Sequence, residues 1–552
     1  MKKTFLTLPL LILALVFVVS CGDSKNTDDT DTATDEPTDT TDNNDPTDPS
    51  ETNSECGNKV TESNEVCDGN AMECNIIDSG YTGGIATCNA DCLGWNVSDC
   101  QGTPVNPDPT DPTNPTDPTN PTDPTDPTDP TTDPTEEITG EIPVDTNFIR
   151  ITADDNPNKP AFVTVGDIDQ DGYLDMVVAQ YGGGLSGNYD IYWGNGKLNQ
   201  WTKETLNIGG NNGISFPHPV KIADVNGDGI NDIVSPSGFL ACLVNCGNIF
   251  WLEGTGTRNQ WTKHEIVTDN DHFFFDVSLV DIDGDGIDDI LTNASQKAKI
   301  GGGQDEKLMW FKGTTTADRF EKTANVISSG NGGPFPRFVD INGDGKKDIA
   351  LAQFFNSDIT TNGSFIWFEQ TDDIENWTKH IIDNESGESF MLEIIDNLYN
   401  DGKRRAVGVN HVNSTANKNG PKEGVFIFDI PEDPTQPWPK KDISTDIKSR
   451  NPLMGNQAAP GLFGYGDITG NGLIDLVVSG DGDSRVFWFE QNPAGTFTQH
   501  TLDGEAGASN SSSDPFGEAG GMQIVDLDGD GRNEIIVTTY EGNKLYIYKY
   551  TK

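Results

Sequence analysis

Residues 281–289 read Asp-Ile-Asp-Gly-Asp-Gly-Ile-Asp-Asp, and variants of this acidic nonapeptide recur along the C-terminal three-quarters of the 552-residue chain. The seven copies begin at Asp167, Asp224, Asp281, Asp340, Asp396, Asp467 and Asp526. Successive first residues therefore lie 57, 57, 59, 56, 71 and 59 positions apart. A nearly constant period of this size is typical of a repeat architecture, in which each repeat is one structural unit.

Six of the seven copies carry oxygen-bearing side chains at positions 1, 3, 5 and 9, with glycine at position 6. These side chains are Asp167, Asp169, Asp171 and Asp175; Asp224, Asn226, Asp228 and Asp232; Asp281, Asp283, Asp285 and Asp289; Asp340, Asn342, Asp344 and Asp348; Asp467, Thr469, Asn471 and Asp475; and Asp526, Asp528, Asp530 and Glu534. Alternate residues of a tight loop point inwards, and the glycine permits the positive φ that turns the chain.

This set of oxygens favours Ca²⁺, which takes six or more oxygen ligands at about 2.3–2.6 Å. In this loop, a backbone carbonyl near position 7 is expected to be one of the ligands. Magnesium prefers octahedral geometry with retained waters, while zinc and copper would call for His or Cys. An acidic turn that binds nothing is the alternative, but four converging carboxylates would repel one another strongly without a cation. We expect about six structural Ca²⁺ ions. The copy at 396–405 has Arg404 and Arg405 where the closing carboxylate belongs, so we predict that a guanidinium replaces the ion there.

Each loop lies between short apolar runs, such as Val277–Val280 before the third copy and Ile290–Leu291 after it. An aromatic strand follows in each repeat, as in Leu308–Trp310, and then usually a further strand that begins with an aromatic residue. Four short antiparallel strands per repeat predict one blade of a β-propeller. We therefore predict an all-β fold, a seven-bladed β-propeller of four-stranded antiparallel blades spanning residues 141–552.

The phase of the repeat predicts how the ring closes. The chain stops just after the third strand of the last repeat, whereas Asn147–Ile151 resembles a fourth strand that has no repeat of its own. We expect this segment to complete the seventh blade and leave no open sheet edge. The recurring tryptophans are interpreted as packing between blades, with sugar stacking as the minor alternative.

The loops, each between a Val/Ile-rich strand and an Ile-Val strand, resemble FG-GAP/VCBS repeats, the family that includes the integrin α-subunit head and many bacterial surface proteins. The resemblance covers roughly residues 147–552. It implies calcium loops on one face, between first and second strands, and ligands on the opposite face.

The loops that enter each first strand, and those that join second to third strands, are expected on that opposite face. They supply Phe239, Lys297 and Phe354 together with our candidate ligand contacts, which are Tyr181, His218, Phe274, Arg337 and His411. We predict a non-catalytic adhesion module for an extracellular glycan or protein ligand. A polysaccharide lyase or sugar dehydratase is the alternative, with histidines such as His218, His272 and His411 as base and Arg337 as carboxylate-binding group.

We assign no catalytic residue, because the sequence lacks a spaced metal triad, a Ser-His-Asp order, a phosphate loop and a Rossmann fingerprint. Three histidines, His264, His380 and His500, recur at one position of the expected fourth strand. That recurrence favours a structural role for them.

The N-terminus predicts export. Residues 1–20 combine a basic start with a short apolar run, which is typical of a signal peptide. Its end resembles a bacterial lipobox, which implies cleavage before Cys21 and lipidation of that residue; an ordinary secretory signal with a chance cysteine is the alternative. The resemblance places the protein at the bacterial outer membrane or cell surface. Residues 21–55 form an acidic tether and residues 101–140 a linker of Asp-Pro-Thr repeats, both expected to be disordered.

Residues 56–100 hold six cysteines in a short segment with almost no apolar core: Cys56, Cys67, Cys74, Cys88, Cys92 and Cys100. An even count of this kind in an exported chain predicts a small disulfide-rich module with any of 15 connectivities, and a zinc site is the alternative. The segment resembles the cysteine-rich repeats of myxobacterial-type surface proteins. Cys242 and Cys246 are expected to close a small loop in the propeller.

The formal charge of the whole chain is −54. Such an acidic protein is not expected to bind nucleic acid through its phosphates, nor anionic membranes by electrostatic attraction. We expect a monomer whose only membrane contact is its lipid anchor.

Overall fold

The computed structural model describes residues 147–182, 187–206, 208, 214–238, 247–296, 306–354, 363–449, 458–505 and 519–552, with short pieces at 71–73, 81–83, 85–88, 95–96 and 100–102. The chain separates into two compact units, Met1–Asp133 and Pro134–Lys552. The predicted signal peptide, Cys21, the acidic tether, residues 103–140 of the predicted linker, the Cys242 to Cys246 loop, Phe239 and Lys297 lie outside the described residues. Gln101 and Gly102, predicted as the start of that linker, belong to a strand. Within the described residues, no helix is long and apolar enough to span a membrane.

The N-terminal unit contains five short strands. A three-stranded sheet has the order β1-β3-β4, from Ala71–Glu73, Ile85–Cys88 and Trp95–Asn96. A second sheet pairs β2, Tyr81–Gly83, with β5, Gln101–Gly102. Cys56, Cys67, Cys74 and Cys92 fall outside the described residues.

The C-terminal unit is built from seven antiparallel four-stranded sheets, as the repeat predicts. Blade 1 has β7 Pro160–Gly166, β8 Asp175–Gln180, β9 Asn188–Trp193 and β10 Thr202–Leu206; blade 2 has β11 Lys221–Ala223, β12 Asp232–Ser237, β13 Gly247–Gly254 and β14 Trp261–Asp269; blade 3 has β15 His272–Val280, β16 Asp289–Gln296, β17 Glu306–Gly313 and β18 Phe320–Ser329. Blade 4 has β19 Arg337–Val339, β20 Asp348–Ala352, β21 Phe365–Gln370 and β22 Trp377–Asp383; blade 5 has β23 Ser389–Ile395, β24 Arg405–Asn410, β25 Val425–Asp429 and β26 Lys440–Asp442. Blade 6 has β27 Phe463–Gly466, β28 Asp475–Ser479, β29 Arg485–Asn492 and β30 Thr496–Gly504; blade 7 has β31 Ala519–Val525, β32 Glu534–Thr539, β33 Lys544–Tyr550 and β6 Phe148–Asp154.

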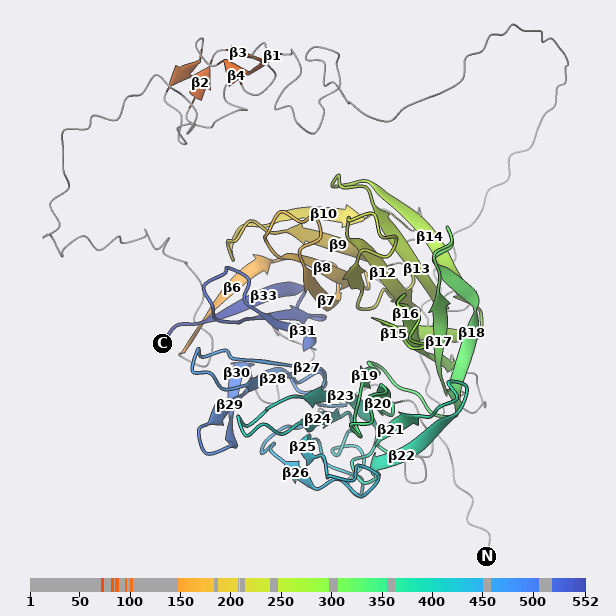
Figure 1. The fold of residues 1–552 in the computed structure, drawn as a ribbon. Coiled ribbons are helices and arrows are strands. Elements are labelled where there is room, and N and C mark those ends of the chain that lie inside the picture. The colour runs from red at the N-terminus through yellow and green to blue at the C-terminus, as the bar shows by residue number, and fades with distance from the viewer. Residues whose placement is uncertain are drawn as a thin grey trace, which may run out of the picture. The chain divides into compact units, whose positions relative to one another are not determined.

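Ring closure follows the predicted phase. Strand β6 from the start of this unit pairs with β33 at the end of the chain, with Ile151 opposite Ile547 and Phe148 opposite Tyr550. Figure 1 shows β6 lying beside β33 in blade 7, with the first strand of each blade nearest the centre of the ring. Because the two ends of the unit share one sheet, blade 7 has the same four strands as the others.

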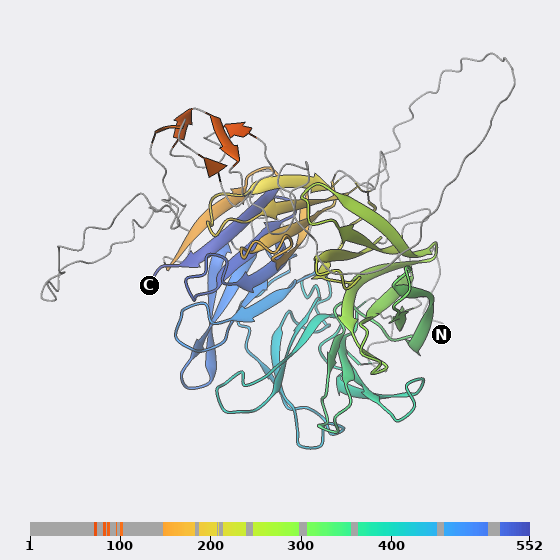
Figure 2. The ribbon, with the colours of Figure 1, turned by 45° about the horizontal axis from the view of Figure 1, so that its top comes forward.

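The burial pattern explains why each strand takes its place. Second strands such as β12, β20 and β28 are buried along their whole length, because neighbouring blades cover both of their faces. Fourth strands such as β14 alternate between partly buried and exposed residues at the rim of the ring. Trp251, Trp367 and Trp488 on the third strands are 2%, 0% and 0% exposed. The predicted packing role of the tryptophans is confirmed, and Figure 2 shows the blades of this unit in a tilted view.

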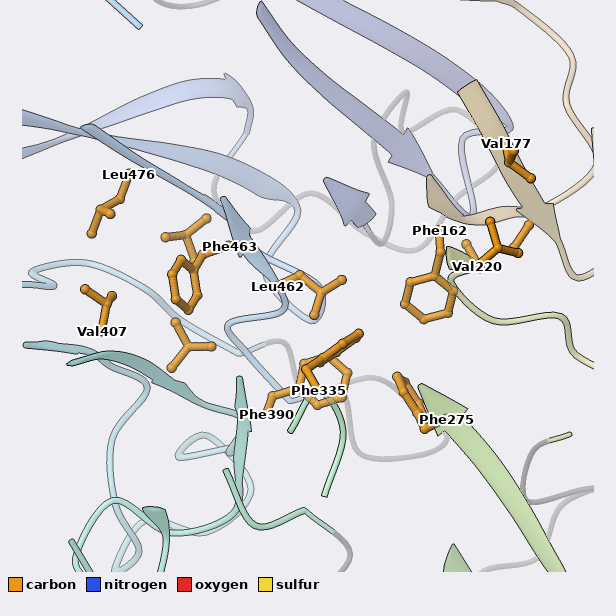
Figure 3. Close-up of a cluster of buried hydrophobic side chains, with 14 of the residues drawn as sticks. Phe162, Val177, Val220, Phe275, Phe335, Phe390, Val407, Leu462, Phe463 and Leu476 are labelled. Atoms are coloured by element: carbon orange, nitrogen blue, oxygen red, sulfur yellow. The ribbon is translucent and has the colours of Figure 1, made fainter. Parts of the chain in front are cut away.

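Aromatic side chains from several blades meet near the axis of the ring. Phe275 packs edge-on against Phe162, Phe335 and Phe390, with ring centroids 5.7, 5.6 and 5.8 Å away. Figure 3 shows these four rings, together with Leu462, converging from separate strands and loops. We call Phe162, Phe275, Phe335 and Phe390 the phenylalanine collar.

Candidate calcium loops and aromatic cup

The backbone of each loop wraps around the carboxylate at position 1. In the third loop, Asp281 Oδ1 accepts a hydrogen bond from Gly284 N at 2.8 Å and Asp281 Oδ2 accepts one from Gly286 N at 2.9 Å. Asp285 Oδ1 in turn accepts from Ile287 N at 3.0 Å. The position-6 glycine has φ of +87° here and between +79° and +91° in the other five intact loops, which is a conformation that favours glycine.

The residue at position 9 joins its loop to the third strand of the blade. Asp289 is fully buried; its Oδ2 accepts a hydrogen bond from Ile282 N at 2.8 Å, and its Oδ1 accepts one from Gly313 N at 2.7 Å. Burial raises the pKa of Asp289 to about 6, and the pKa of Asp475 and of Glu534 to about 7, with neighbouring loop carboxylates adding to each shift. A nearby cation would offset both the burial and the repulsion.

Several loop oxygens are buried without a hydrogen-bond partner. Buried oxygens of this kind are available to bind a cation, so their positions show whether an ion fits the loops. They are Asp167 Oδ1, Asp169 Oδ1, Thr469 Oγ1, Asp475 Oδ2 and Glu534 Oε1. In three loops, one oxygen from each of three carboxylates lies within 4.8 Å of the others: Asp167, Asp169 and Asp175; Asp281, Asp283 and Asp285; and Asp526, Asp528 and Glu534. Such orphaned oxygens are the donor set that a hard cation takes. The residues present therefore fit Ca²⁺.

Basic side chains also reach the three loops that have aspartate at position 3. Lys312 Nζ contacts Asp283 and lies 2.6 Å from Asp285 Oδ2, and Lys549 Nζ contacts Asp528 in the same manner. Arg258 extends from blade 2 to Asp169 of the first loop. These cations partly neutralise the aspartates that would hold the ion.

The blades whose loops have Asn or Thr at position 3 lack this basic side chain. In its place, a glutamate on the third strand pairs with a histidine on the fourth strand. Glu369 Oε1 accepts from Asn342 Nδ2 at 3.0 Å, and Glu369 Oε2 lies 2.9 Å from His380 Nε2. The His380 ring stacks on Trp367 at 4.4 Å. Glu253 with His264 and Glu490 with His500 repeat the pair, and these histidines stack on Trp251 and Trp488. The structural role predicted for the three histidines is confirmed.

The fifth loop is closed by an ion pair. Arg405 is buried at the start of β24, and its Nη1 and Nη2 donate to the two carboxylate oxygens of Asp401 at 2.8 and 2.7 Å. Its Nε donates to Asp429 Oδ1 at 2.7 Å. A guanidinium thus lies where the other loops place a carboxylate, as the sequence predicts; Arg404 pairs with Asp396 beside it.

The opposite ends of the first and second strands surround an aromatic cup with a volume of 310 Å³. One wall contains Tyr181, whose ring lies 5.1 Å from Phe216 and 5.8 Å from Tyr540. The other wall contains Phe354, Phe390 and His411, with centroids 5.0–5.3 Å apart. Phe162 and Phe275 of the collar also line the cup, as does Asp481. The loops predicted to gather on this face supply Tyr181, Phe216, Phe354 and His411, whereas Phe162, Phe275 and Phe390 belong to the first strands β7, β15 and β23.

Two residues that line the cup have left-handed backbone conformations, as do eight other non-glycine residues among those described. Phe216 has φ of +44° and Asp481 has φ of +52°, in the left-handed region that few side chains other than glycine adopt readily. Such conformations cost free energy and persist where the surrounding structure holds a residue in place for a function. Burial lowers the pKa of His411, so its imidazole stays neutral among the aromatic rings.

The five predicted ligand contacts separate into four environments. Tyr181 and His411 line the cup. His218 is fully buried behind it, 4.3 Å from the Phe275 ring, and burial lowers the His218 pKa to about 4. Arg337 lines a different cavity on the axis, and Phe274 is 1% exposed and packs against Phe311 within blade 3. The structure therefore brings two of the five predicted residues together and adds Phe216, Phe354 and Tyr540.

Comparison with protein families agrees with the loop geometry. Residues 167–235 and 467–537, which contain the first, second, sixth and seventh loops and the strands around them, match a model of the FG-GAP-like repeat. No curated protein matches the chain.

Among solved structures, the propeller is similar in fold to a lectin from Agrocybe aegerita described as recognising non-reducing terminal N-acetylglucosamine. The two share 15% identity over 70% of this chain and 87% of the lectin, with a TM-score of 0.39. An α-L-arabinofuranosidase from Fusarium graminearum, in complex with an iminosugar inhibitor, shares 10% identity over 72% and 96%, also at 0.39. A sialidase from Streptococcus pneumoniae shares 9% identity over 72% and 69%, at 0.33. Likeness at this level identifies no ligand or reaction for this chain.

The third-strand residues beside the loops were missed in the sequence, although the repeats do contain a signal. The third-strand residue beside the loop is Lys312 or Lys549 where position 3 is aspartate, and Glu253, Glu369 or Glu490 where it is Asn or Thr. Blade 1 departs from this pattern, because Trp193 occupies the strand position and Arg258 arrives from blade 2. Alignment of the seven repeats on position 9 would have shown the alternation.

Proposed function

We propose that this protein is a calcium-stabilised cell-surface binding module whose aromatic cup takes a glycan. The observation that carries the proposal is the cup, which combines two walls of aromatic rings with a few polar groups on the face opposite the loops. Aromatic rings offer flat apolar surfaces to the faces of a sugar ring, while the Asp481 carboxylate and the hydroxyl groups of Tyr181 and Tyr540 supply hydrogen bonds.

Calcium would serve this function by holding the scaffold rigid. Ions held by the six intact loops would neutralise the clustered carboxylates at one end of the blades, while the cup residues lie at the other end of the same first and second strands. Because ions that bind only the folded chain stabilise it by mass action, calcium would raise the stability of the ring. Sites placed on a rigid scaffold keep their side chains in position.

Attachment to the cell would come from a lipid on Cys21, with the linkers as a spacer between membrane and propeller. The proposal rests on the lipobox resemblance and on the Asp-Pro-Thr composition of residues 101–140, since proline-rich segments remain extended. Metabolic labelling with a fatty acid tests it: label should enter the exported protein and be lost from Cys21→Ser.

The lyase or dehydratase alternative gains no support from the described residues. His218, its first candidate base, is buried and a weak base, and it lines neither the cup nor the axial cavity. Arg337 is paired with Glu393. A binding module therefore remains the function that the geometry supports best.

A glycan array, followed by titration calorimetry of the best ligand, tests the cup. Phe354→Ala should weaken binding at least tenfold, because it removes one ring from a wall. Ile381→Ala, on the exposed rim of the same blade, is the matched control and should bind as the wild type does. Equal affinity of all three proteins would contradict the proposal, and appearance of an unsaturated-uronate product from the bound polysaccharide would favour the lyase.

A further inference from the structure

A second cavity, with a volume of 800 Å³, lies on the axis of the ring. Its lining includes Asp167 and Asn231 from the calcium-loop region, and Phe162 and Phe335 of the collar. Phe162 and Leu462 line both this cavity and the cup. The two cavities adjoin at these residues, but the axial cavity has its own set of polar side chains.

Asp276 is the unusual residue of the axial cavity. It is fully buried on β15, yet neither of its carboxylate oxygens has a hydrogen-bond partner among the described residues. The ammonium of Lys221 on β11 is 3.8 Å from Asp276 Oδ1, which is too long for a hydrogen bond. A buried carboxylate left in this state costs free energy unless a donor from a bound molecule satisfies it.

The distance between Lys221 and Asp276 indicates which chemical group of a ligand could bind between them. One oxygen atom placed between them can accept a hydrogen bond from the Lys221 ammonium and donate its own proton to the Asp276 carboxylate. A ligand hydroxyl group has both capacities, as a water molecule has, whereas a carboxylate cannot donate and an ammonium cannot accept.

The charge of the cavity points to the same chemistry. Beside Asp167 at the calcium-loop end of the cavity, two basic residues, Lys221 and Arg337, face two acidic residues, Asp276 and Glu393. Arg337 Nε already donates to Glu393 Oε1 at 2.6 Å. An anionic ligand would meet the two carboxylates and a cationic ligand would meet the two bases. A neutral ligand avoids both penalties.

The remaining wall suits a ring-shaped ligand. Phe335 and Phe162 both line the cavity, and Phe335 has a left-handed backbone conformation with φ of +60°. Thr164 and Gln523 add polar groups on the other strands. A cavity of this volume that offers apolar surfaces together with placed polar groups is typical of small-molecule sites.

We infer that the axial cavity is a second ligand site, which takes a neutral sugar ring and holds one of its hydroxyl groups between Lys221 and Asp276. This site is independent of the glycan role proposed for the cup, because Lys221 and Asp276 do not line the cup.

Titration with single sugars tests the inference on the full exported chain in calcium. The probes are the methyl pyranosides of glucose, galactose and mannose, with glucuronic acid and glucosamine as charged analogues. At least one neutral pyranoside should bind with a Kd of about 1 mM, which is reasonable for a ligand of this size. The charged analogue of the same sugar should bind at least fivefold more weakly.

Two variants locate the bound sugar. Asp276→Asn and Lys221→Met should each weaken binding at least tenfold, since each removes one of the two hydroxyl partners, and thermal melting verifies that both fold. Asp318→Asn, an exposed aspartate at the rim of blade 3, is the matched control and should bind as the wild type does. Wild-type affinity in both variants, no pyranoside binding at about 10 mM, or crystallographic density for the sugar only in the cup would each overturn the inference.

Discussion

Arg405 begins β24 at the register position that Asp348 occupies at the start of β20. Asp348 pairs with Val339 in blade 4, and Arg405 pairs with the equivalent Ile395 in blade 5. The backbone of the blade is the same, but the closing charge has the opposite sign. A guanidinium bound to Asp401 and Asp429 can therefore supply, within the chain, the positive charge that we propose calcium supplies elsewhere.

Arg405→Met should destabilise the propeller by about 2 kcal/mol, because the side chain is buried and its charge-assisted hydrogen bonds to two aspartates are lost. The loss should be the same in calcium and in chelator, since no ion is expected in this loop. Thermal melting in both conditions measures it. A variant that loses stability only in chelator would show that blade 5 also depends on the ion.

Asp285→Ala should remove one calcium ion from the third loop and leave the others, because the loops of different blades are separate. The matched control is Asp288→Ala at position 8 of the same loop, where the side chain is exposed and outside the proposed oxygen set. Native mass spectrometry counts the ions in both proteins. Unchanged ion content in Asp285→Ala would contradict the assignment of position 5.

Lys312→Met should have opposite effects with and without calcium. Its ammonium contacts Asp283 and Asp285, so its loss exposes their repulsion in the calcium-free protein and lowers the melting temperature. The same change removes a competing cation, and calcium should bind the third loop about tenfold more tightly. Lys322→Met, an exposed lysine of the same blade, should change neither quantity. A weaker affinity in Lys312→Met would mean that the lysine supports the bound ion.

Stability of the calcium-free protein should fall as the pH rises from about 4 to about 7. The pKa of Asp289 is about 6 in the fold, above its ordinary 3.8, and the pKa of Glu534 is about 7, above 4.5. The folded chain therefore binds more protons than the unfolded chain across this window, so raising the pH favours unfolding. Saturating calcium should abolish the decline. Denaturant unfolding at several pH values measures it, and a stability that rises with pH without calcium would contradict the shifts.

The repeat period made the fold predictable to the level of strand order. Position 9 is an example: because each loop is closed by a carboxylate between two apolar runs, Asp289 had to lie where the loop meets the second strand. The closure of blade 7 by β6 also followed from the phase of the repeat, since an unpaired edge would otherwise remain. Local patterns of this kind recur seven times, which makes them readable from one chain.

For the cup, the sequence predicted the face of the propeller on which it lies but not which side chains line it. The loops that reach it were identified, but whether a side chain points outwards depends on packing that no short pattern encodes. Phe274 follows the strand inwards and is buried against Phe311, whereas Phe216 is turned by a positive φ towards Tyr181. The isolation of Asp276 arises from residues of neighbouring blades and leaves no signal in the local sequence.

Elemental analysis of the exported protein after dialysis against about 1 mM calcium tests the central claim most directly. We predict about six calcium ions per chain, one for each intact loop, and a marked fall in melting temperature after chelation. Absence of bound calcium, with the same melting temperature in chelator and in calcium, would contradict the account.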